Sequence, residues 1–419
     1  MEIDPRDFIR NPYTECPNCG KIEFGVLMIN GSGYVKRCRE CWETKAYSLP
    51  KLNKKVIYLD QFVVSNMMKS INTSIASKDA NDDYFRTIFK KLDYLSKAQI
   101  IVCPDSDIHY KESVVARNYD EIKQMYKLLS SGLGFMHTVE LNRGHLFRAF
   151  KKWLGADVTI MKDSETVIRG LNNWNDRIIL EVSFETQEID IQAIRQDKKE
   201  KDIIFNRLHS EWKDLKDKDF DFFYQNELYA IGRAYIQFYI EFIEENAKLQ
   251  QGLENNIEKY IGTDIVTTMF EFCEMLDFKT SDLGEKLNMI GNFFNSDIMM
   301  EIPNHRISSL MFAAKARRIV AGQKKFGSSS FANDVKVISS YLPYSDAMFI
   351  DKECHRLLQE NPIPDEIGFE TKLFSLANRD EFIKYLDELI NEIPVAHMAL
   401  IKQVYGESWP APYITMYEN

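Results

Sequence analysis

Val56-Ile-Tyr-Leu-Asp60 is a short run of apolar, β-favouring residues that ends at a carboxylate. A run of this kind between polar residues is typical of a buried strand. Residues 83–97 then place apolar side chains at helical spacing, and Gln99-Ile-Ile-Val-Cys103, closed by Pro104, has the character of a second buried strand. Strand, helix and strand in this order indicate a βαβ unit, so the sequence predicts an α/β fold with a parallel sheet flanked by helices.

The same pattern returns toward the C-terminal end. A predicted helix beginning near residue 331 leads into two further apolar runs, Ala347-Met-Phe-Ile350 and Lys372-Leu-Phe-Ser375. A final amphipathic helix begins at Asp380. Between these two α/β stretches the chain is rich in charged and aromatic residues at helical spacing, which predicts a helical insertion.

The composition limits the classes of protein that the chain can form. It has 419 residues, of which 45% are hydrophobic, enough for a sizeable core in two or three folded units. The 53 Lys and Arg against 63 Asp and Glu give a net charge of −10, which disfavours a uniformly positive nucleic-acid coat protein but allows a local basic patch. No apolar run is long enough to span a bilayer and no secretion signal is recognisable, so we expect a cytoplasmic protein without membrane contact.

Four of the seven cysteines are close together near the N-terminus. They form two CxxC pairs with eighteen residues between them: Cys16, Cys19, Cys38 and Cys41. Each pair can form a tight knuckle that presents two thiolates to one tetrahedral ion, and residues 22–35 between the knuckles suit a hairpin. The pattern predicts a zinc ribbon in which the zinc is structural, because a site of four thiolates is coordinatively closed. A contact of this ribbon with nucleic acid or with a protein partner stays open.

These segments define the expected domain organisation. The zinc ribbon takes residues 1–50, the α/β domain takes residues 54–150 and 301–395, the helical insertion takes residues 151–300, and a C-terminal tail takes residues 396–419.

Carboxylates recur at the expected active edge of the sheet. Asp60 and Asp351 each follow an apolar strand, and ligands of open parallel sheets bind outside the carboxyl ends of the strands. Glu112 lies in a helix that Ser106 or Asp107 can cap after the second strand, and Asp334 lies in the helix before the Asp351 strand. Acids gathered in this way repel one another unless a cation neutralises them, and oxygen ligands suit Mg²⁺ or Mn²⁺. The matching chemistry is metal-dependent phosphodiester hydrolysis.

The membership of this acidic group has alternatives. Asp105 and Asp107 lie close to Glu112 in the sequence, and either can replace it. Asp346 also precedes the Asp351 strand, but strand alternation turns it away from Asp351 and puts it at the opposite end of the strand, which favours a structural role.

These segments resemble the PIN-like nucleases. The resemblance rests on residues 56–60, on an acid in the helix after the second strand, and on Asn333-Asp334 followed by Tyr341-Leu-Pro-Tyr-Ser-Asp-Ala-Met-Phe-Ile-Asp351. It implies a metal-dependent ribonuclease or flap nuclease whose acidic quartet is Asp60, Glu112, Asp334 and Asp351. It covers residues 54–150 and 300–395. The chain departs from the family in its ribbon, its insertion and Ile350, where a small hydroxylated residue is usual, so the substrate is less determined than the chemistry.

A nuclease also needs cations to hold its substrate. Residues 306–325 contain no Asp or Glu, and they lead directly into the Asp334 helix. We expect nucleic acid, RNA rather than DNA by the resemblance, to bind at Lys315, Arg317, Arg318, Lys324 and Lys325.

Two other classes of function compete with an active nuclease. One is a nucleic-acid or protein binding module whose PIN-like domain has lost its metal. The other is a nuclease held inactive until it is triggered, as in a toxin or an anti-phage effector, with the helical insertion as a sensor and with a regulatory protein or a second copy as partner. Phosphate-binding glycine loops and HExxH zinc motifs are absent from the sequence, which disfavours nucleotide-cofactor enzymes and metalloproteases.

Overall fold

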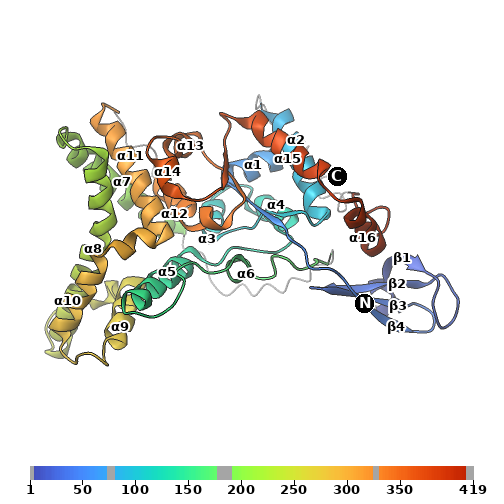
Figure 1. Cartoon of the computed structure of the whole chain (residues 1–419), viewed down its shortest axis with the longest axis horizontal. Coiled ribbons are helices and arrows are strands. Elements are labelled where there is room, and N and C mark those ends of the chain that lie inside the picture. The colour runs from blue at the N-terminus through green and yellow to red at the C-terminus, as the bar shows by residue number, and fades with distance from the viewer. Residues whose placement is uncertain (1–3, 73–80, 177–190, 324–329, 412–419) are drawn as a thin grey trace.

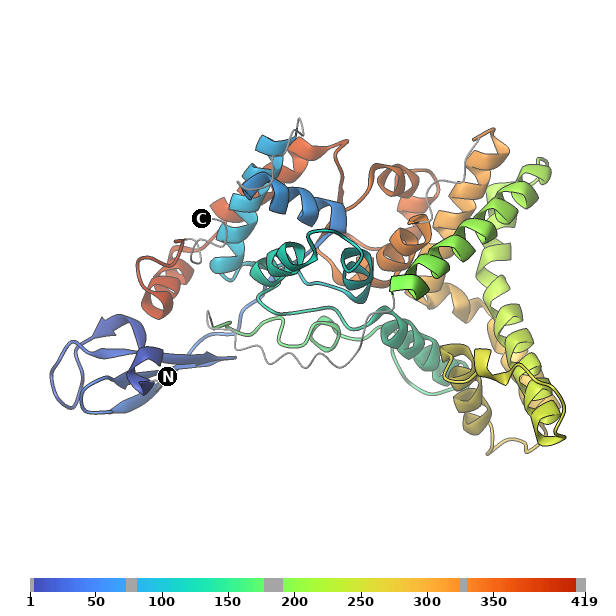
Figure 2. The same cartoon turned by 180° about the vertical axis from the view of Figure 1, so that it is seen from behind.

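The computed structural model describes residues 4–72, 81–176, 191–323 and 330–411. Three parts follow one another along the long axis of the molecule (Figure 1). A small antiparallel sheet lies at one end, a parallel sheet with its helices occupies the middle, and a group of long helices forms the other end. Figure 2 shows the same succession from behind.

The central sheet is parallel throughout. Its strand order is β6-β5-β7-β8, and all three neighbouring pairs run parallel. The strands are β5 (Lys55–Leu59), β6 (Ile101–Val102), β7 (Ala347–Phe349) and β8 (Lys372–Phe374). These strands coincide with the four apolar runs of the sequence, so the prediction of an α/β fold with a parallel sheet is confirmed.

The two faces of this sheet bury different side chains. On one face, Ile57 and Leu59 pack with Phe349 in a core that includes four helices. On the other face, Val56 and Tyr58 join a larger core that continues into the long helices. Since both faces are covered, the strands are apolar at every position except the exposed first residues of β5 and β8, Lys55 and Lys372, and they do not alternate. The helices of the first face are α1 (Gln61–Ile71), α2 (Asp82–Lys97), α4 (Tyr119–Ser130) and α15 (Arg379–Asn391).

The strand order reverses between β5 and β7. The chain passes from β5 to β6 on one side and later returns to β7 on the other side. Ligands of doubly wound sheets bind outside the carboxyl ends of the strands at such a reversal. Asp60 follows β5 and Asp351 lies two residues after β7, so both acids stand at this point.

The N-terminal sheet has the order β1-β2-β3-β4 and is antiparallel. Its strands are β1 (Arg10–Thr14), β2 (Phe24–Asn30), β3 (Gly33–Cys38) and β4 (Thr44–Ser48). The hairpin expected between the two CxxC pairs is β2 with β3, and that prediction is confirmed.

The residues expected to form a C-terminal tail contain a helix, α16 (Val395–Tyr405). Ile401, Val404 and Tyr405 of this helix share a buried cluster with Ile29 and Tyr34 of the N-terminal sheet. Residues 396–411, the described part of the expected C-terminal tail, therefore pack into the fold, and some of their apolar partners lie more than 350 positions earlier in the chain.

The segment expected to be a helical insertion contains several helices in its described part, and their packing continues beyond residue 300. Helix α11 lies along α7 and α8 (Figure 1) and also contacts α12, the helix that leads into β7. The helices concerned are α5 (Thr138–Trp153), α7 (Ile191–Asp214), α8 (Phe220–Gln250), α9 (Asp264–Met275), α10 (Leu283–Phe294), α11 (Pro303–Val320) and α12 (Phe331–Tyr341). None of the helices that the structure describes combines the length and the apolar character that a bilayer span needs.

Candidate functional site

The four N-terminal cysteines come together in one cluster. Their Sγ atoms all lie within 4.8 Å of one another. The Cys16 and Cys41 sulfurs are 3.5 Å apart, and those of Cys19 and Cys38 are 3.7 Å apart. Sulfurs held at about 2.3 Å from a tetrahedral zinc are separated by about 3.8 Å, so the four side chains fit this ion. The cluster can therefore hold zinc, and four thiolates leave no position open for a substrate.

Asp60 and Asp351 occupy equivalent places at the carboxyl edge of the central sheet. Each is the N-cap of the helix that follows its strand, α1 for Asp60 and α13 (Lys352–Leu358) for Asp351. Asp60 accepts a hydrogen bond from the Phe62 amide at 3.4 Å, and Asp351 accepts one from the Cys354 amide at 2.8 Å. Because β5 and β7 are neighbours, the two carboxylates face the same edge.

Glu112 and Asp334 come from two further elements. Glu112 lies on α3 (Asp107–Ser113), which Ser106 caps through a hydrogen bond to the His109 amide. Asp334 lies in the first turn of α12. The neighbouring Asn333 donates from Nδ2 to Oε1 of Glu112 at 3.1 Å, so this hydrogen bond joins the two helices beside the site.

The charges of the four acids act on one another. Burial, then the charges of Glu112 and Asp351, raise the pKa of Asp60 to about 7. Burial, then the charges of Asp60, Glu112 and Asp351, raise the pKa of Asp334 to about 9. The four carboxylates that the sequence singled out thus lie within electrostatic reach of one another at the strand-order reversal. Such a group favours the binding of a divalent cation, which would relieve the repulsion.

The tightest part of this group contains a side chain that the sequence analysis did not assign to it. Asp334, Asp351 and Cys354 offer ligand atoms that all lie within 4.8 Å of one another. The Cys354 side chain is fully buried. The sequence signal that could have identified Cys354 as a member of the group is its position three residues after Asp351, because this spacing puts the two side chains on the same side of the first helical turn.

The three alternative acids have other partners. Asp107 accepts hydrogen bonds from the Thr138 hydroxyl at 2.9 Å and the Tyr341 hydroxyl at 3.1 Å, so it joins α3 to α5 and α12. The main chain of Asp105 pairs with the segment around Gly134, and burial raises the pKa of its carboxyl. Asp346 accepts from Lys55 Nζ at 2.7 Å and from the Val56 amide at 2.8 Å.

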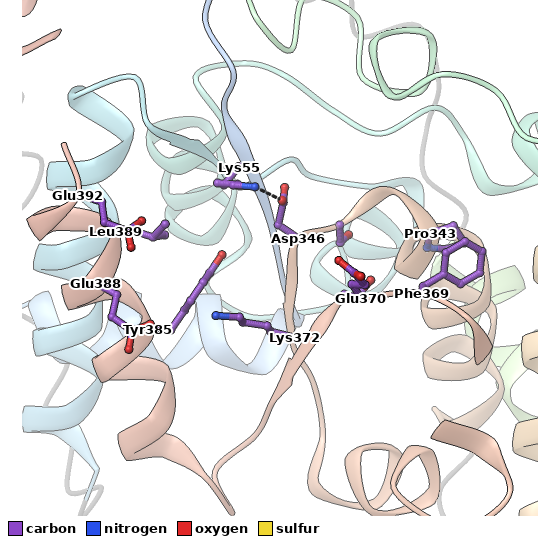
Figure 3. Close-up of a pocket in the computed structure, with 12 residues that line it drawn as sticks. Lys55, Pro343, Asp346, Phe369, Glu370, Lys372, Tyr385, Glu388, Leu389 and Glu392 are labelled. Carbon is purple, nitrogen blue, oxygen red and sulfur yellow. Dashed lines mark hydrogen bonds and ion pairs between the residues drawn. The ribbon is translucent and has the colours of Figure 1, made fainter. Parts of the chain in front are cut away.

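Asp346 belongs to the opposite end of the sheet. A pocket of about 400 Å³ lies there, and Figure 3 shows Asp346 and Lys55 paired between Tyr385 and Glu370. Lys372, Glu388 and Glu392 also line it. This pocket is separated from the acidic group by the length of β7, because Asp346 precedes the strand and Asp351 follows it.

The expected substrate-binding role is contradicted for Lys315, which is not on the surface. The Lys315 side chain is 0% exposed, and its ammonium group is paired with Glu353. Arg317 and Arg318 are both paired with Glu360. These acids lie 35 to 45 residues further along the chain, so an inspection of the local run alone missed them. Lys324 and Lys325 lie outside the described residues.

The chain was compared with family models, with curated proteins and with solved structures, and none of the three gives a match. The interpretation of the acidic group therefore depends on its own geometry and chemistry.

Proposed function

We propose that this protein is a metal-dependent nuclease of PIN-like type, most simply an endoribonuclease. The observation that carries the proposal is the gathering of four carboxyl groups from four separate elements at the strand-order reversal of a parallel sheet. The mutual charge effects on Asp60 and Asp334 are the physical sign of this gathering. Clusters of strongly perturbed acids in such a position are typical of catalytic sites.

The proposed roles follow from the positions of the side chains. Asp60, Glu112, Asp334 and Asp351 would hold Mg²⁺ or Mn²⁺, and such an ion, when bound, supplies water activation and charge stabilisation for phosphodiester hydrolysis. The N-caps fix Asp60 and Asp351 relative to the sheet, because each carboxylate is tied to the first turn of its helix. The hydrogen bond from Asn333 fixes Glu112 relative to the Asp334 helix.

The ribbon offers further candidate contacts for the substrate, since the buried Lys315 cannot supply one. Arg37 lies over the Trp42 ring at 4.6 Å, and Arg39 lies over the Tyr13 ring at 5.8 Å. Trp42 is among the exposed large side chains. Cations beside accessible aromatic rings suit single-stranded nucleic acid, whose bases stack and whose phosphates are anionic. These pairs also favour the second candidate, a binding module that contacts RNA or a protein through its ribbon.

Cleavage assays distinguish the two candidates. Single-stranded RNA, single-stranded DNA and duplex DNA, each end-labelled, would be incubated with Mg²⁺, Mn²⁺ or a chelator. We expect cutting of RNA by the wild type with a divalent ion, and loss of cutting in Asp60→Asn and Asp334→Asn. Asp346→Asn, at the other end of β7, is the matched control and should cut normally. Binding of RNA by all four proteins without cutting would instead identify the binding module.

A growth assay addresses the gated form of the nuclease. If the activity is that of a toxin or an anti-phage effector in the cytoplasm, expression should inhibit growth once the trigger or regulatory partner is supplied, and Asp334→Ala should relieve the inhibition. Equal inhibition by the wild type and by Asp334→Ala would argue against this role.

A further inference from the structure

The acidic group contains a sulfur ligand at its most crowded point. The Cys354 thiol and the carboxylates of Asp334 and Asp351 have their ligand atoms within 4.8 Å of one another. Cys354 is 0% exposed. In the part of the chain that the structure describes, its sulfur has neither a disulfide nor a hydrogen-bond partner. A fully buried, unpartnered thiol thus faces two carboxylates across a distance that one ion can bridge.

The first turn of α13 explains why this side chain faces the acids. Asp351 caps the helix by accepting a hydrogen bond from the Cys354 amide, which draws the two residues together. The intervening Glu353 is held by Lys315 in an ion pair. Within this turn, the Cys354 sulfur therefore lies close to one carboxylate oxygen of Asp334 and one of Asp351, and these three atoms form a possible ligand set.

The other thiols outside the ribbon have different surroundings. Cys103 lies in the apolar core on one face of the sheet. Cys273 lies on α9, where Tyr239 is its hydrogen-bonding neighbour. Of the three thiols, Cys354 is the one grouped with carboxylates, so its place in the site is not a general property of buried cysteines in this chain.

The donor set determines which ion suits this corner of the site. Mg²⁺ is a hard ion that takes oxygen ligands and retains several waters. Thiolate sulfur favours softer, transition-metal ions. We propose that Asp334, Asp351 and Cys354 together bind one divalent transition-metal ion, of the class from Mn²⁺ to Zn²⁺, in preference to Mg²⁺. Binding would release the thiol proton to solvent, because the thiolate is the ligand. The use of this ion in catalysis rests on the proposed nuclease, whereas its binding does not.

Cobalt is a suitable probe, because a cobalt–thiolate bond gives a charge-transfer absorption that a cobalt–carboxylate bond lacks. Co²⁺ would be titrated into full-length protein whose ribbon already contains zinc, followed by absorbance and by calorimetry. The variants are Cys354→Ser and Cys354→Ala, and Cys273→Ser is the control for loss of a buried thiol. Thermal melts establish that each variant is folded. The spectrum of each Cys354 variant is subtracted from that of the wild type, which removes the absorbance of any cobalt that has exchanged into the ribbon.

We expect the wild type and Cys273→Ser to show the charge-transfer band, and both Cys354 variants to lack it. We also expect Co²⁺ affinity to fall by ~10-fold or more in the Cys354 variants, with little change for Mg²⁺. An unchanged band and an unchanged Co²⁺ affinity in folded Cys354 variants would overturn the inference. If the charge-transfer band depends on Cys354 but no nucleic acid is cut, the metal site is supported and the proposed nuclease activity is contradicted. If cutting depends on Asp60 while cobalt binding is independent of Cys354, the nuclease activity is supported and the proposed role of Cys354 as a metal ligand is contradicted.

Discussion

Asn333 and Glu112 are joined by a hydrogen bond of 3.1 Å from Nδ2 to Oε1, although they are 221 positions apart in the sequence. The bond connects the N-terminal turn of α12 to α3. Asp334 is the next residue along α12, so the same contact sets the distance between two of the four acids. Side chains that orient ligands in this way control the affinity of a site without contacting the ion.

Removal of this contact should weaken the site without unfolding the protein. Asn333→Ala should lower cleavage by ~10–100-fold and raise the concentration of divalent ion needed for half-maximal rate, because Glu112 is no longer held toward Asp334. Single-turnover cleavage measured against ion concentration checks this. Asn142→Ala is the matched control: it removes a 3.0 Å hydrogen bond to Ser340, near the other end of the same helix. Equal rates for Asn333→Ala and the wild type at every ion concentration would contradict the assigned role.

The sequence predicted the elements whose signals are local. The four strands of the central sheet are apolar runs because both of their faces are buried, and the two CxxC pairs identify their knuckles directly. The paired state of Lys315 was not predictable in this way, since its partner Glu353 lies 38 positions away and on another helix. The packing of α16 against the ribbon was missed for the same reason.

The acidic group was predicted as a set of residues but not as a geometry. Strand ends locate Asp60 and Asp351, because a carboxylate after a buried strand must lie at the edge of the sheet. The position of Asp334 depends on the packing of α12 against α5 and α11, which involves residues spread over 200 positions. The participation of Cys354 depends on which side of a single helical turn faces inward. A buried thiol also has the same sequence signal as an ordinary apolar core residue, so the sequence did not identify Cys354 as a ligand.

The raised pKa values predict how stability changes with pH. Asp60 and Asp334 have pKa values in the folded protein of about 7 and about 9, above their ordinary values. The folded state therefore binds more protons than the unfolded state over this range, and the free energy of unfolding should fall as pH rises from about 4 to about 9. Without added divalent ions, the melting temperature should be roughly 5 °C lower at about pH 9 than at about pH 6.

Two comparisons attribute this effect to the acidic group. Asp334→Asn should reduce the fall in melting temperature, since an amide does not ionise, and added Mn²⁺ should reduce it in the wild type. Asp346→Asn is the control, because its carboxylate is at the other end of β7. A pH dependence that is identical in Asp334→Asn and the wild type would show that the repulsion arises elsewhere.

Lys315 should act on stability and not on substrate binding. Its side chain is fully buried, and its loss leaves Glu353 unpaired beside Asp334. Lys315→Met should therefore reduce the free energy of unfolding by ~1–3 kcal/mol, less than for a fully buried pair because Glu353 is 33% exposed. Urea denaturation checks this, and addition of Glu353→Gln should restore much of the loss. If Lys315→Met weakened RNA binding while leaving the urea midpoint unchanged, the assignment as a buried structural cation would be wrong.

Zinc bound at the four ribbon cysteines should stabilise a helix from the far end of the chain. Ile29 and Tyr34 of the ribbon are buried with Ile401 and Val404 of α16, so loss of the ribbon structure exposes one side of that helix. A ribbon of this size has too small a core to fold without its ion. Cys38→Ser, which removes one of the four sulfurs, should release the zinc and increase hydrogen exchange in both β2–β3 and α16. The central strands β5 and β7 should keep their protection, because their cores are formed by other residues. Cys273→Ser is the control, because it leaves all four ribbon sulfurs, and it should change neither the zinc content nor the hydrogen exchange of α16. If α16 kept its protection in zinc-free Cys38→Ser, the helix would dock without the folded ribbon.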